Sequence, residues 1–327
     1  MGVVGRRQFL VAAGALLAAP LSANAQKPGK VYRIGFLRPA QPPAPWMDAF
    51  RKGLRRLGYV EGRDLVIESR WAGGKAERLA ALADELVRLN LEVIVASGTV
   101  AILAAKDATR VIPIVMAAVG APVETGLVAS FARPGGNITG VSNAIADVGA
   151  KRLELLKEVV PTISSVAVLW NGANPYTVTV VEQTKGAARS LGIQLQFLEV
   201  RAATEFDRAF TAATHGRPDG LFVVEDPLTI SHRRPIADFA AKQRLPAVYG
   251  SGGFVKVGGL LSYGASFPAL YGRAAVFVDK ILKGAEPADL PVERPTRFEF
   301  LINLKTAKAL DLTIPPSILL RATQVIQ

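Results

Sequence analysis

The order of apolar and polar residues along the first half of the chain predicts alternating strands and helices. Short apolar runs bounded by glycine or proline indicate buried strands, and apolar residues three or four apart indicate one face of a helix. The predicted strands are Val31–Leu37, Asp64–Ser69, Glu92–Ala96 and Ile112–Met116. The predicted helices carry the stripes Trp46, Phe50, Leu54, Leu57 and Leu79, Leu82, Leu86, Leu89, and a third helix covers Thr99–Lys106. This β-α-β-α order predicts a parallel sheet with helices on both faces.

A second series of the same kind follows a turn cluster at Arg133–Asn137 and an extended run at Ile138–Asn143. Its predicted strands are Ser165–Leu169, Ile193–Val200, Gly220–Val224 and Pro246–Tyr249, followed by an extended run at Gly258–Tyr263 and a last strand near Phe298–Ile302. Helices are expected at about 148–160, 175–190, 204–214 and 231–242, and along the stripe Leu270, Ala274, Phe277, Ile281. Asn174 before Pro175 is a helix start, an N-cap with proline at the first helical position.

Two β/α halves of similar size predict an α/β fold of two Rossmann-like, doubly wound lobes joined by a hinge. We expect one lobe at 26–140 plus about 264–290, the other at about 141–263, and a C-terminal crossing and cap at 291–327. Ligands bind such sheets at the carboxyl ends of the strands and often between domains. A ligand cleft between the lobes is therefore expected, with hinges near Ile138–Asn143, Leu260–Gly264 and Leu290–Thr296.

The first 25 residues have the pattern of an export signal. Arg6 and Arg7 precede an uncharged apolar stretch, and Ala23-Asn24-Ala25 offers a cleavage site after Ala25. The run Arg6–Leu10 also matches a twin-arginine pattern. The alternative is an N-terminal membrane anchor, for which the apolar stretch is short, since a spanning helix needs roughly 20 residues. We therefore expect the mature protein to be exported from the cytoplasm without a membrane anchor.

Composition narrows the classes of function. Of 327 residues, 50% are apolar and 20% charged, which excludes disorder as the main state. Cysteine is absent and only His215 and His232 are present, so the usual metal sites and catalytic triads have almost no residues available. The net charge of +12 is spread along the chain without an aromatic-interleaved basic run, which argues against nucleic-acid binding. No phosphate-binding loop or nucleophile elbow occurs, so we expect no cofactor, no metal and no catalytic residue.

The candidate ligand contacts are small polar and tyrosine residues near strand ends. Ser97-Gly98-Thr99 opens a helix, where free amides and two hydroxyls favour a carboxylate, or where a side chain only caps the helix. Asp226 either holds a ligand ammonium or starts the next helix. The remaining candidates are Asn143, Asn171, Tyr249 and Tyr263; the tyrosines could supply ring surface with a hydroxyl, although tyrosine at a lobe interface often only packs. Ser251-Gly252-Gly253 is expected to form a flexible loop.

Seven segments in order resemble the ABC-transporter substrate-binding proteins whose characterised members bind aromatic amino acids such as tryptophan or tyrosine. They are RIGFLR at 33–38, LGYVEG at 57–62, ASFARPGGNITG at 129–140, VLWN at 168–171, GLLSYG at 259–264, DKILKG at 279–284 and INLKTA at 302–307. The resemblance implies the type I periplasmic-binding-protein fold, a small amino-acid-like ligand, and ABC permease and ATPase partners. Ser97, Gly98, Thr99, Asn171 and Asp226 stand where the pattern expects ligand contacts, whereas Gly250–Gly253 departs from it.

These observations together predict a monomeric periplasmic solute-binding protein that is not an enzyme. It would capture an amino acid or a related zwitterion and deliver it to the permease. Two alternatives remain open from the sequence: an exported enzyme acting on a small carboxylate, and a ligand-sensing protein that feeds a signalling partner.

Overall fold

The computed structural model describes residues 30–42, 46–143 and 145–327. Val31–Gln327 form one compact unit that contains two sheets. The predicted export signal at 1–25 lies outside the described residues. In the described part of the chain, no helix combines the length and the apolar character needed to cross a bilayer.

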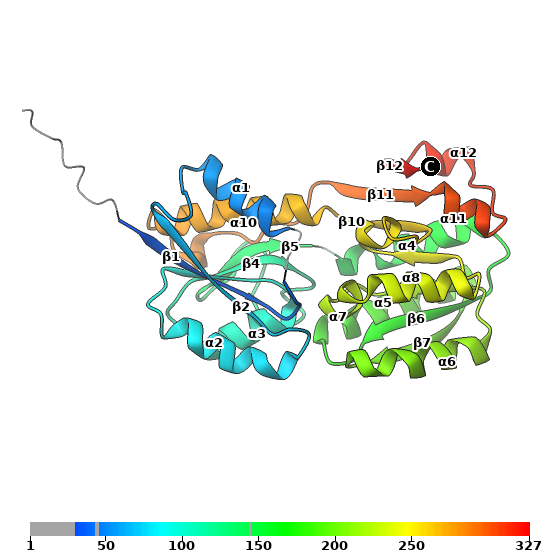
Figure 1. Cartoon of the computed structure of the whole chain (residues 1–327), viewed down its shortest axis with the longest axis horizontal. Coiled ribbons are helices and arrows are strands. Elements are labelled where there is room, and N and C mark those ends of the chain that lie inside the picture. The colour runs from blue at the N-terminus through cyan, green and yellow to red at the C-terminus, as the bar shows by residue number, and fades with distance from the viewer. Residues whose placement is uncertain (1–29, 43–45, 144) are drawn as a thin grey trace, which may run out of the picture. The chain divides into compact units, whose positions relative to one another are not determined.

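The first sheet has five parallel strands in the order β2-β1-β3-β4-β5. Figure 1 labels β1, β2, β4 and β5 of this sheet. Every residue of β3 and β4 is buried, as expected for a parallel sheet covered on both faces. The strands are β1 Tyr32–Arg38, β2 Leu65–Trp71, β3 Val93–Ala96, β4 Ile114–Val119 and β5 Ile138–Ser142. Its helices are α1 Met47–Arg56, α2 Leu79–Val87 after the 3-10 turn Ala76–Arg78, α3 Thr99–Ala108 and, from much later in the chain, α10 Phe267–Leu282, which packs beside α1.

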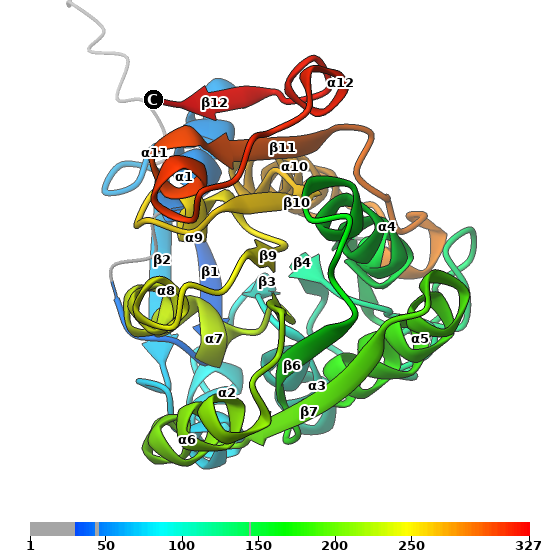
Figure 2. The ribbon, with the colours of Figure 1, turned by 90° about the vertical axis from the view of Figure 1, so that its right-hand side faces the viewer.

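The second sheet has seven strands in the order β12-β11-β10-β9-β8-β6-β7, with α4 and α5 on one face and α6 and α8 on the other (Figure 2). The strands are β6 Ser165–Asn171, β7 Gln194–Val200, β8 Gly220–Val223, β9 Ala247–Tyr249, β10 Leu261–Ala265, β11 Phe298–Asn303 and β12 Gln324–Ile326. The helices are α4 Ile145–Val159, α5 Pro175–Leu191, α6 Phe206–Gly216, α7 Pro227–Ser231, α8 Arg233–Lys242, α9 Gly252–Val255, α11 Leu304–Ala309 and α12 Pro316–Leu319, with a 3-10 turn at Ala203–Glu205. Another 3-10 turn, Pro287–Asp289, contacts β5 of the first sheet. The α/β fold class with two mainly parallel sheets is confirmed.

One strand pair differs from the predicted parallel arrangement, because β10 and β11 are antiparallel. The chain leaves the second sheet along β10, forms α10 against β4 and β5 of the first sheet, and returns along β11. Neighbouring strands that carry the chain out and back must run in opposite directions. The residue ranges of the lobes stay a prediction.

Two local predictions have clear outcomes. Asn174 caps α5 as expected, its side chain accepting a hydrogen bond from the Tyr176 amide at 3.1 Å. The prediction of a flexible loop at Ser251–Gly253 is wrong, because the Ser251 side chain caps the short helix α9. A serine hydroxyl at an N-cap satisfies an otherwise unpaired helical amide, and this outweighs the low helix propensity of two glycines.

Candidate functional site

A cavity lies where strands of both sheets end. From the first sheet and its helices it is lined by Arg38, Trp46, Ser97, Gly98, Thr99, Ala118, Gly120, Asn143 and Phe267. From the second it is lined by Asn174, Tyr176, Glu225, Asp226, Pro227 and Ile230. Most of these residues follow the carboxyl ends of β1, β3, β4, β5 and β8, which is where parallel α/β sheets place ligands.

The Ser97-Gly98-Thr99 segment opens α3 beside this cavity. Gly98 is the N-cap and no side chain caps the helix, so neither Ser97 nor Thr99 is used as a cap. The Ser97 hydroxyl is instead paired with the Tyr271 hydroxyl at 2.5 Å. Gly98 has φ +88°, and a Cβ there would lie 3.1 Å from Pro227 of the second-sheet half. Glycine therefore allows both the backbone conformation and the close approach.

Asp226 is buried, and its carboxylate is held by three donors. Oδ1 accepts from the Asn171 amide at 2.9 Å and the Leu228 backbone at 2.7 Å, and Oδ2 accepts from the Asn174 amide at 2.7 Å. These contacts make Asp226 the N-cap of α7, one of the two roles expected for it. A carboxylate accepts about four hydrogen bonds, so these three donors of the described chain leave one position on Oδ2. Burial raises the pKa of this carboxyl, and the bonds from Asn174, Asn171 and Leu228 oppose the rise.

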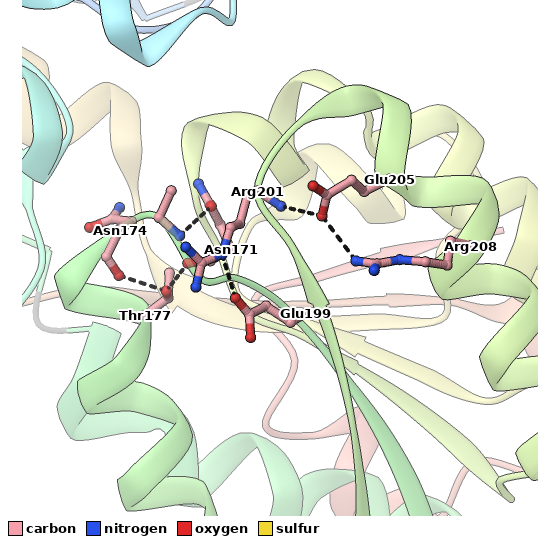
Figure 3. A network of polar contacts seen from close by, with 8 residues as sticks. Asn171, Asn174, Thr177, Glu199, Arg201, Glu205 and Arg208 are labelled. Atoms are coloured by element: carbon pink, nitrogen blue, oxygen red, sulfur yellow. Dashed lines mark hydrogen bonds and ion pairs between the residues drawn. The ribbon is translucent and has the colours of Figure 1, made fainter.

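Asn171 does not line the cavity but supports the residues that do. Its carbonyl and that of Asn174 both accept from the Thr177 hydroxyl, which fixes the start of α5 (Figure 3). Its side-chain oxygen accepts from the Ala173 amide, and its amide group binds Asp226. Asn171 is therefore placed to orient Asp226.

Glu225 lines the cavity beside Asp226 and is paired with a buried arginine. Arg152 of α4 donates from Nη1 to Glu225 Oε2 at 2.8 Å and from Nε to the Tyr263 carbonyl at 2.6 Å. The two side chains are 0% and 1% exposed. Burial raises the pKa of Glu225, and the Arg152 charge opposes this. Tyr176 also lines the cavity, and its pKa lies well above the usual value because the hydroxyl is buried near Glu225.

Arg38, Trp46 and Phe267 also line the cavity and were missed as candidates. The Arg38 guanidinium lies 4.9 Å from the Trp46 ring centroid, and Trp46 stacks on Phe267 at 4.5 Å. These three residues and Ile230 also line an outer cleft of about 1230 Å³. Arg38 directly follows the apolar run of β1. A charged residue at the end of a buried strand could have identified it as a candidate ligand contact. The two aromatic residues gave no such signal, because their spacing suits ordinary core packing.

The two predicted tyrosines lie elsewhere. Tyr249 is fully buried and stacks on Phe254 at 4.5 Å, and Tyr263 stacks on Phe298 at 5.7 Å; neither lines the cavity. Strand alternation directs their rings into the packing around β10 and β11. Asn143 does line the cavity, together with Ser97, Gly98, Thr99 and Asp226. Among the described residues, no group of three or more potential metal ligands occurs.

Comparisons with known proteins agree with this architecture. A tyrosine-binding protein of Clostridioides difficile is 29% identical over 263 residues, covering 80% of this chain and 75% of the relative. The solved ABC domain of Streptococcus pneumoniae in complex with L-Trp is 28% identical, with a TM-score of 0.83 over 91% of this chain and 100% of that one. A conserved domain protein of Vibrio cholerae is 28% identical, with a TM-score of 0.84 over 90% and 100% of the two chains.

A match to a protein-family model covers most of the chain. The model of the ABC transporter substrate binding proteins matches residues 45–326, which include every strand of both sheets except β1. The cavity between strand ends lies within the same range, apart from Arg38. The chain therefore belongs to the family of ABC transporter substrate binding proteins.

Proposed function

We propose that this protein is the periplasmic solute-binding component of an ABC importer and captures an amino acid in the cavity described above. The observation that carries this proposal is Asp226, a carboxylate only 3% exposed that lines the cavity and has no cationic partner in the described part of the chain. A buried charge without a partner is costly, and a ligand ammonium at Oδ2 would compensate it. The relatives named for tyrosine binding and for an L-Trp complex support the same ligand class.

The carboxylate of the ligand would lie at the start of α3. Gly98 and Thr99, at the start of the ten-residue helix α3, line the cavity, and a helix N-terminus favours a negative group. The hydroxyls of Ser97 and Thr99 would add hydrogen bonds. The ammonium would bind Asp226, held in place by Asn171 and Asn174.

The ligand would also favour closure of the two halves. Ser97 and Thr99 follow a first-sheet strand, whereas Asp226 follows a second-sheet strand, so one bound molecule would contact both. A ligand shifts a conformational equilibrium only by its difference in affinity for the two states, and bridging supplies that difference. The closed form would deliver the ligand to the permease and ATPase. Stoichiometric, reversible binding without turnover would separate this function from an enzymatic one.

Asp226→Asn provides the test. Asparagine is as good an N-cap as aspartate, so α7 is expected to persist while the charge is lost. Calorimetry should show an affinity loss of about 2–5 kcal/mol for the best-bound amino acid among the natural twenty. Asp219→Asn is the matched control, because that carboxylate holds Ser164 and Ser165 at the surface away from the cavity. Unchanged affinity in Asp226→Asn would remove this residue from the site.

Identification of the ligand and of the mature N-terminus would complete the test. Mass spectrometry of small molecules released on denaturation should find an amino acid in protein purified from its native compartment. A library of amino acids should contain one that raises the melting temperature, since a ligand at one hundred times Kd stabilises by about 2.7 kcal/mol. The exported protein should begin at Gln26.

A further inference from the structure

Arg38 carries a buried positive charge that no carboxylate of the described residues neutralises. The residue ends β1, is 4% exposed and lines the cavity. Its Nη1 atom is buried and has no hydrogen-bond partner. Within the described ranges, no carboxylate lies within 4.0 Å of its guanidinium. Buried arginines are normally paired, because an uncompensated charge away from water is strongly unfavourable.

The acidic residues of the same cavity do not fill this role. Glu225 is already paired with Arg152 at 2.8 Å. Among the residues that the structure describes, Asp226 receives only amide donors, from Asn171, Asn174 and Leu228. The cavity thus has one uncompensated cation, contributed by the first sheet, and one uncompensated anion, contributed by the second. A ligand with both charges would compensate both groups at once.

The surroundings of Arg38 fix its orientation without using its donors. The guanidinium packs against the Trp46 ring at 4.9 Å, and Trp46 is itself held by Phe267. An arginine held against an aromatic face keeps the N–H groups at its edge free for a planar anion, and a carboxylate can accept two of them. Lysine lacks this planar arrangement of donors.

We propose that Arg38 binds the carboxylate of the ligand and thereby makes the site selective for zwitterions over the corresponding amines. This inference rests on the proposed function and adds a charged anchor to the helix start at Ser97–Thr99. It also makes ligand charge a condition for tight binding, because a ligand without the anion would leave Arg38 buried and unpaired.

The test compares L-tyrosine with tyramine, which lacks only the carboxylate, and L-tryptophan with tryptamine. Wild-type protein should prefer each amino acid to its amine, and Arg38→Met should lose about 30-fold or more in affinity for the amino acid while binding the amine as well as before. Arg38→Lys should retain part of the preference. Arg33→Met is the matched control, since Arg33 lies on the same strand and pairs with Glu68 at the surface.

The outcomes separate the two proposals. An unchanged preference in Arg38→Met would overturn the role of Arg38 and leave the proposed function standing. Equal losses for amino acid and amine would also overturn it, because they would indicate a structural role through Trp46. Failure of the wild-type protein to bind any of the twenty amino acids would refute the proposed function itself.

Discussion

Gly250 occupies a position that no side chain can share with the buried Arg152–Glu225 pair. A Cβ at this residue would overlap Glu225 Oε1 and Arg152 Nη2, far inside the 3.0 Å limit that real Cβ contacts respect. The backbone at Gly250 does not have a positive φ, so alanine is conformationally acceptable there. The expected effect of Gly250→Ala is therefore purely steric and acts on the ion pair.

The magnitude depends on whether the two side chains can move aside. Both are buried, and Arg152 is fixed by Glu225 and by the Tyr263 carbonyl. Overpacking alone costs about 1–3 kcal/mol. Displacing one partner of a buried pair costs about 3–5 kcal/mol, because it leaves a charge uncompensated. Since both side chains are almost completely buried, we expect the larger figure for the loss in free energy of unfolding.

Urea denaturation followed by circular dichroism measures this loss, through the midpoint and the linear extrapolation. Gly186→Ala is the matched control: Gly186 lies within α5 with open space around it, so alanine should stabilise by about 0.5–1 kcal/mol. A loss below about 1 kcal/mol in Gly250→Ala would refute the reasoning, since it would mean that the pair does not lie against this glycine.

Three further results are expected. Amino-acid affinity should fall as the pH is lowered through the raised pKa of Asp226 and stay level above that pKa, because only the ionised carboxylate binds an ammonium. Calorimetry over a pH series measures this, and an affinity that does not change with pH in the acid range would contradict it. Gly120→Ala should weaken ligand binding by about 1–3 kcal/mol, because its Cβ would overlap the Tyr176 ring across the cavity; an affinity equal to wild type in titration would contradict this contact. Ala118→Gly should raise the free energy of unfolding by about 1 kcal/mol, because Ala118 has φ +106° at a bulge in β4; an unchanged urea midpoint would show that no strain is stored there.

The apolar pattern predicted the two β/α series because a strand that is buried on both faces consists almost entirely of apolar residues. Such a run can be recognised from the residues of the strand alone. The fully apolar runs at β3 and β4 and the helical stripe on α1 could be recognised without any knowledge of their neighbours. The N-cap at Asn174 was equally local, since the cap and the amide it accepts from are two residues apart. Polar residues just after predicted strands also led to Ser97, Thr99, Asn143 and Asp226 as candidates, and these four line the cavity.

Only the tertiary structure decided which of the polar groups are already satisfied. Glu225 and Asp226 are neighbours in sequence, yet one is neutralised by Arg152, 73 residues away, and the other is held by two asparagines. The same holds for Tyr249, whose ring packs in the core, and for Arg38, whose guanidinium has an aromatic neighbour but no anionic partner in the described part of the chain. A sequence shows which side chains can carry a charge, whereas pairing depends on contacts between residues far apart in the chain, and those contacts determine which charges are left for a ligand.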